Sequence, residues 1–132
     1  MNNSKALKTY LIISGLLLSF IGGATLLMPV EMKASAGIDI ASNISVINDV
    51  RAASAMILGV AILSLVGAFN PKLTFSATLS TILLFLSLGA GRVISILIDG
   101  MPVEGLLGAT GLELVLGALG AVFFKVFQPS HK

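Results

Sequence analysis

The sequence predicts an all-α integral membrane protein, an antiparallel four-helix transmembrane bundle with both termini in the cytoplasm. Three observations lead to this fold class. Hydrophobic residues make up 56% of the 132 residues and charged residues only 11%, whereas a soluble domain carries about 25% charged residues. The mean hydropathy is +1.05. Four apolar runs are each long enough for the ~20 residues that a membrane-spanning helix needs, and together they form a single domain.

The first apolar run covers residues 9–28 and contains no charge. A secretory signal peptide is the alternative interpretation, because Lys5 and Lys8 precede the run and residues 34–36 (Ala-Ser-Ala) imitate a cleavage site. However, the run exceeds the ~7–15 apolar residues of a signal peptide. The sequence therefore favours an uncleaved first span.

Three further runs follow at short intervals. The second covers about 50–69 and ends before the turn dipeptide Asn70-Pro71. The third covers about 73–98 and is followed by Asp99-Gly100-Met101-Pro102, and the fourth covers about 104–127. All are apolar on every side and too long for strands, so each is predicted to be a helix.

The longest predicted loop comprises residues 30–49. Its segments 38–40 and 44–46 alternate apolar and polar residues, which is compatible with a short β-hairpin over the mouth of the bundle. A surface turn of helix is an equally good interpretation, and the sequence leaves the two open.

The distribution of lysines predicts the orientation. Only Lys33 lies in a loop on the side of residues 30–49, whereas five lysines fall on the opposite side: Lys5, Lys8, Lys72, Lys125 and Lys132. Because basic residues concentrate in cytoplasmic loops, residues 30–49 are predicted to be outside.

Small residues recur at spacings of three or four, which permits close helix contact in a membrane. We interpret them as packing seams of the bundle, with an oligomer interface as the alternative. They are Gly15, Ser19 and Gly23; Ala55, Gly59 and Gly67; Ser87, Gly91 and Ser95; and Gly105, Gly108, Gly111, Gly117 and Gly120.

Arg92 and Glu113 each lie well inside an apolar run, where a charge at the helix centre costs about 2.5–3.5 kcal/mol on insertion scales. Arg92 precedes Asp99 by seven residues, and Glu113 follows Glu104 by nine. At 1.5 Å per residue they lie ~10 and ~13 Å below the same surface. The sequence therefore predicts an Arg92–Glu113 ion pair between the last two helices.

Further polar residues are predicted to gather at the same outer end of the bundle. Together with Arg92 and Glu113 they form the candidate binding cluster: Asn48, Asp49, Arg51, Ser95, Asp99 and Thr110. Three interpretations remain open. The ion pair fixes helix register, the cluster lines an outward-facing pocket, or Glu113 serves in a proton or ion relay.

Catalytic and metal-binding signatures are absent from the sequence. It has no cysteine, its one histidine is His131, and it has no phosphate-binding loop. We therefore expect no enzyme activity, no cofactor, no metal site and no nucleic-acid partner.

Three segments carry a resemblance to a known family: Asn48–Ala52 (N-D-x-R-A), Gly91–Pro102 (G-R-V-I-S-I-L-I-D-G-M-P) and Glu113–Gly117 (E-L-V-L-G). They resemble the bacterial membrane-protein family catalogued as domain of unknown function 4345. The resemblance implies four membrane helices in the bacterial cytoplasmic (inner) membrane. It implies no activity, and it marks as motif positions Arg51, Arg92, Asp99, Gly100, Pro102 and Glu113.

The function expected from the sequence is non-enzymatic. The outer polar cluster is predicted to bind a membrane lipid, a small hydrophobic or anionic molecule, or a partner membrane subunit. The alternatives are a small oligomeric transporter that uses Glu113 and an accessory subunit of a membrane enzyme.

Overall fold

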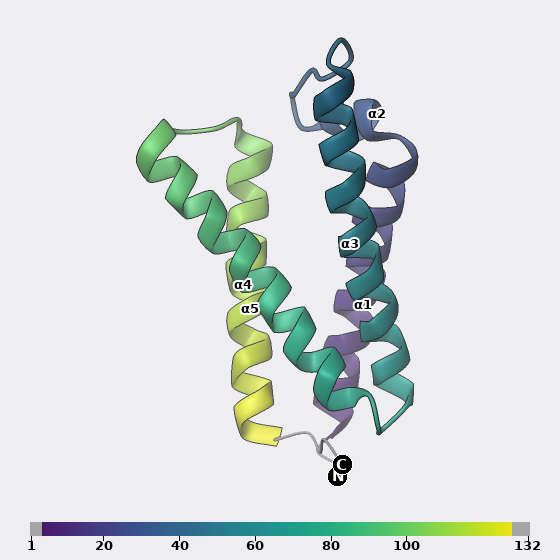
Figure 1. Cartoon of the computed structure of the whole chain (residues 1–132). Helices are drawn as coiled ribbons and strands as arrows, with labels where there is room; N and C mark the ends of the chain where they lie inside the picture. Colours follow the sequence, from purple (N-terminus) through teal and green to yellow (C-terminus); the bar gives the residue numbers. More distant parts are fainter. Residues whose placement is uncertain (1–3, 128–132) are drawn as a thin grey trace.

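A computed structural model describes residues 4–127 and contains five helices (Figure 1). They are α1 (Ser4–Leu27), α2 (Pro29–Ser35), α3 (Ile44–Phe69), α4 (Thr74–Asp99) and α5 (Glu104–Phe127). The described residues contain no strand, which confirms the all-α class. The four helices other than α2 are long and apolar enough to cross a membrane. His131 and Lys132 lie outside the described residues.

The connection between α1 and α3 differs from the hairpin interpretation. Because residues 38–46 contain no strand, the hairpin is wrong, and the helical interpretation holds only for residues 44–46, the first turn of α3. The Asn43 side chain caps this turn by accepting a hydrogen bond from the Val46 amide at 3.1 Å, a role that favours helix initiation. Before it, the short helix α2 begins with Pro29, whose fixed φ suits a first helical turn.

Helices α1 and α3 lie side by side along their length (Figure 1). A Cβ added at Gly22 would lie 2.8 Å from the Leu58 amide nitrogen, so the two backbones meet without side chains between them. The buried Ser64 hydroxyl donates a hydrogen bond to the Leu11 carbonyl at 2.8 Å. Close backbone contact and hydrogen bonds between helices are the main sources of helix association in lipid.

Helices α4 and α5 form the second pair. Leu86 packs over Gly117, and Leu114 packs over Gly89, each leucine occupying the space that a Cβ on the glycine would need. This reciprocal packing fixes the α4–α5 register and sets the relative heights of Arg92 and Glu113.

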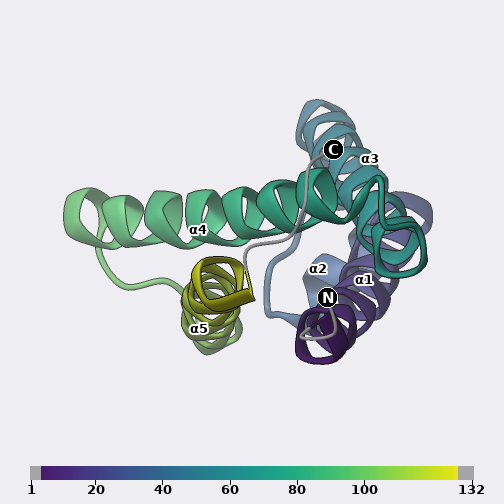
Figure 2. The same cartoon turned by 90° about the horizontal axis from the view of Figure 1, so that it is seen from below.

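The two pairs meet at the end of the molecule that carries the Lys72 turn, here called the Lys72 end. There the Tyr10 hydroxyl of α1 donates to the Leu116 carbonyl of α5 at 2.8 Å, and its ring packs edge-on against Phe123. Toward the opposite end, here called the α2 end, α4 diverges from α3 (Figures 1 and 2). The two helix pairs thus lie closer together at the Lys72 end than at the α2 end (Figure 1).

The prediction of close packing at small residues is confirmed at some glycines and wrong at others. Close contacts form at Gly15, Gly67, Gly105, Gly117 and Gly120. Nothing lies within 4 Å of the Cβ position at five predicted glycines: Gly23, Gly59, Gly91, Gly108 and Gly111. Gly22 and Gly89, which the spacing did not select, are contact points. Spacing identifies a helix face but not which of several Gly-rich faces meets a neighbour.

Candidate functional site

The Arg92–Glu113 ion pair expected from the sequence is present. Arg92 Nε donates to Glu113 Oε1 at 2.8 Å, and the two side chains are 31% and 12% exposed. Arg92 lies seven residues from the end of α4, and Glu113 lies nine residues into α5. The α4–α5 packing brings these two heights together, so each charge has a partner in an apolar segment.

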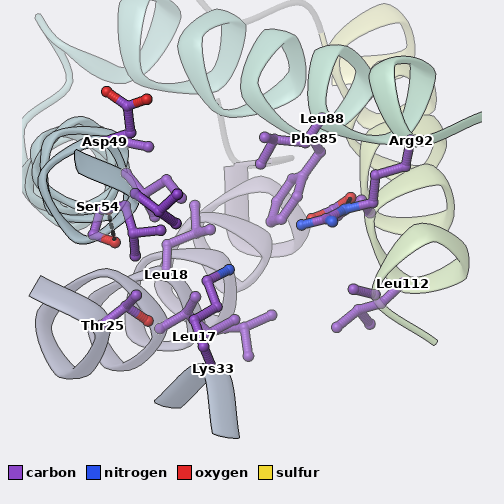
Figure 3. A pocket seen from close by; sticks show the side chains of 17 residues that line it. Leu17, Leu18, Thr25, Lys33, Asp49, Ser54, Phe85, Leu88, Arg92 and Leu112 are labelled. Carbon is purple, nitrogen blue, oxygen red and sulfur yellow. Dashed lines mark hydrogen bonds and ion pairs between the residues drawn. The ribbon is translucent and has the colours of Figure 1, made fainter. Parts of the chain in front are cut away.

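Beside this pair lies a cavity of about 340 Å³, here called the α2-end cavity (Figure 3). All five helices contribute residues to its wall. Most of the lining is apolar and includes Leu17, Leu18, Ile57, Phe85 and Leu112. The charged lining residues are Lys33, Asp49, Arg92 and Glu113. An apolar wall with a few convergent polar groups is typical of a small-molecule site.

Lys33 is a charged cavity residue that the sequence interpretation did not include in the cluster. It projects from α2 into the α2-end cavity, and its ammonium group faces the Arg92 guanidinium (Figure 3). Burial, and next the positive charge of Arg92, lower the pKa of Lys33. One sequence feature sets Lys33 apart: it is the lysine that lies in the loop predicted to be outside, whereas the other lysines fall on the opposite side.

Ser95 and Thr110 line a different space. A second cavity of about 360 Å³, the α4–α5 groove, includes both residues together with Arg92. The Ser95 hydroxyl donates to Asp99 Oδ2 at 2.9 Å, and the buried Thr110 hydroxyl donates to the Leu106 carbonyl at 2.8 Å. Arg92 therefore lines both cavities, and the residues of the predicted cluster are divided between the two.

The cluster residues predicted at the start of the second long helix do not lie together either. Asp49 lines the α2-end cavity, but its carboxylate points away from Lys33 and Arg92 (Figure 3). Arg51 is exposed, and its Nη1 donates to the Leu26 carbonyl near the end of α1. Asn48 is exposed and lines neither cavity. Because α3 already begins at Ile44, these residues occupy successive positions around a helix and face different directions.

The site offers charges and apolar surface. Across residues 4–127, no three acidic or histidine side chains are close enough together to hold a metal ion. The arrangement can receive a molecule that has one polar end and one apolar part, with the polar end beside Arg92 and Lys33.

Four long apolar helices define this chain as a multi-pass membrane protein. The model of the family described as Domain of unknown function (DUF4345) matches residues 6–124, and the chain belongs to that family, as its motifs indicated. No curated protein and no solved structure matches the chain significantly.

Proposed function

We propose that this protein binds an amphiphilic molecule in the α2-end cavity and that this role is non-enzymatic. The amphiphile that fits best is a membrane lipid. The observation that carries the proposal is the composition of one cavity wall. Charged groups from α2, α4 and α5 lie at one side, and most of the remaining wall consists of apolar side chains. Such a wall matches a molecule whose headgroup and chain need different surroundings.

The size of the cavity supports partial enclosure of a lipid. Its volume of about 340 Å³ lies at the lower end of the ~300–1,000 Å³ of typical ligand pockets. It fits a headgroup and the first part of an acyl chain, while the rest of the chain extends between helices into the bilayer.

The proposal includes the orientation expected from the lysines, with both termini cytoplasmic in a bacterial inner membrane. The α2 end then faces outward, and Arg92 lies ~10 Å below the outer end of α4. The cavity is consequently at the depth of the outer lipid headgroups and upper acyl chains.

A binding role is better supported than a transport path through Glu113. Toward the Lys72 end, the Tyr10–Leu116 hydrogen bond and the Tyr10–Phe123 contact join α1 to α5 below the cavity. Glu113 is also engaged by Arg92. The third alternative is a partner subunit, such as a membrane enzyme to which this chain is an accessory. Such a partner would have to cover the cavity from outside.

Thermal unfolding of the delipidated protein tests the proposal. Added phospholipid at ~100 times its Kd is expected to stabilise the wild type by about 2.7 kcal/mol. Ala109→Phe fills the cavity wall and is expected to abolish this gain. Ala118→Phe is the matched control, because Ala118 is exposed on the same helix and lines neither cavity. Equal lipid stabilisation of both variants would contradict the proposal.

A further inference from the structure

We infer that the ligand of the α2-end cavity carries an anionic oxygen group, a phosphate or a carboxylate, bound between the Lys33 ammonium and the Arg92 guanidinium. The inference rests on the proposed function and names the headgroup class that the cavity selects. Its basis is the approach of two like charges from different helices toward one space (Figure 3).

The position of Lys33 is unfavourable while the cavity contains no anion. Its side chain is partly buried, and the nearby Arg92 adds electrostatic repulsion. No carboxylate within residues 4–127 forms an ion pair with Lys33. A long lysine side chain on a surface helix could instead extend into water, so its direction into the cavity points to a negatively charged occupant.

Arg92 retains donors for such an occupant. Its hydrogen bond to Glu113 uses Nε–H, and arginine has four further N–H donors on its two terminal nitrogens. Figure 3 shows the guanidinium directed into the cavity, toward Lys33. The fork of a guanidinium matches two oxygens of a phosphate or carboxylate, and an ammonium adds a mobile donor.

The acidic residues at the cavity do not neutralise both cations. Glu113 is paired with Arg92, which leaves Lys33 as the excess positive charge. The Asp49 carboxylate lies on the opposite wall and points away from the two cations. An anion between Lys33 and Arg92 would balance the charge of the site, whereas a zwitterionic headgroup would bring its own cation to the same place.

Native mass spectrometry of the full chain with defined lipids tests this inference. The delipidated protein is mixed with equal amounts of phosphatidylglycerol and phosphatidylcholine that have the same acyl chains. We expect about tenfold preferential binding of phosphatidylglycerol, the size of effect that one charge-assisted hydrogen bond supplies. Lys33→Gln is expected to remove the preference, and Lys33→Arg to retain it. Lys72→Gln, an equal charge change at the exposed Lys72 turn, is the control and is expected to behave like the wild type.

Each other outcome has a defined meaning. Equal binding of both lipids, unchanged by Lys33→Gln, overturns the inference but leaves lipid binding in place. Binding of neither lipid overturns the proposed function as well. A parallel sample with inorganic phosphate distinguishes a lipid headgroup from a free anion. Phosphate binding without lipid binding would make the cavity a site for free oxyanions and would contradict binding of an amphiphile.

Discussion

Arg92 on α4 and Glu113 on α5 form a hydrogen-bonded ion pair of 2.8 Å that closes one side of the α2-end cavity. The pair is asymmetric, because the Arg92 side chain is 31% exposed and that of Glu113 only 12%. Glu113 therefore depends on Arg92 for its charge balance, whereas Arg92 also borders both cavities. Arg92 thus takes part in helix packing and also lines the proposed ligand site.

The ion pair should be detectable by a double-mutant cycle. Arg92→Ala and Glu113→Ala are each expected to lower the free energy of unfolding, because each leaves an unpaired charge. The loss should stay below the ~3–5 kcal/mol of a fully buried pair, since Arg92 is partly exposed. The double variant should recover part of the loss, measured by denaturant titration in mixed micelles. Strictly additive losses would show that the two residues are not energetic partners.

Adjacent glycines on α1 provide a sensitive test of helix packing. Gly22→Ala places a Cβ 2.8 Å from the Leu58 nitrogen and 3.0 Å from the Ser54 carbonyl oxygen, and is expected to destabilise the protein by ~1–3 kcal/mol. Gly23→Ala meets nothing within 4 Å and should leave stability unchanged or slightly raised. Thermal unfolding of the two variants measures the difference. A larger loss for Gly23→Ala would mean that α1 is rotated relative to α3.

Lys33 should destabilise the ligand-free protein. Burial and Arg92 lower its pKa in the folded state below the ordinary 10.5. Between these two pKa values the unfolded chain binds more protons, so the unfolding free energy should rise with pH over that interval. Below both values the cost of the charged Lys33 is fully present, and Lys33→Gln should stabilise the lipid-free protein at neutral pH.

The measurement is the difference in melting temperature between Lys33→Gln and the wild type, from neutral pH upward. It should shrink as Lys33 loses its proton; the other charged residues of the cavity wall are Arg92, Glu113 and Asp49. A lower melting temperature for Lys33→Gln at neutral pH would mean that Lys33 is a stabilising partner in the empty protein.

The proposed orientation can be tested because the chain has no cysteine. Single cysteines at Ser42 and Lys72 are both in exposed connections, at the α2 end and the Lys72 end respectively. In intact cells a membrane-impermeant maleimide should label Ser42→Cys and not Lys72→Cys, and both should react after lysis. Labelling of Lys72→Cys alone in intact cells would reverse the orientation and place the cavity on the cytoplasmic side.

Sequence reasoning was most successful where simple physical rules apply without knowledge of the tertiary packing. Charged residues in an apolar segment need a partner, and a rise of 1.5 Å per residue gives their depth. These two rules predicted the Arg92–Glu113 contact. Length and hydropathy likewise located the four long helices.

Sequence reasoning failed where the direction of a side chain depends on tertiary packing. Arg51 shares the end of the molecule with Arg92, yet it donates to the Leu26 carbonyl at the end of α1. Ser95 and Thr110 are near Arg92 along the helices but border the other cavity. Lys33 was considered only for topology, because nothing in the sequence shows that α2 turns its side chain inward.

The most direct test of lipid binding in the α2-end cavity is native mass spectrometry of protein extracted gently from its membrane. We predict a reproducible mass excess, equal to one lipid, on the wild type and on Ala118→Phe, and its loss from Ala109→Phe. A bare chain in all three samples, or the same bound mass on Ala109→Phe, would contradict the account.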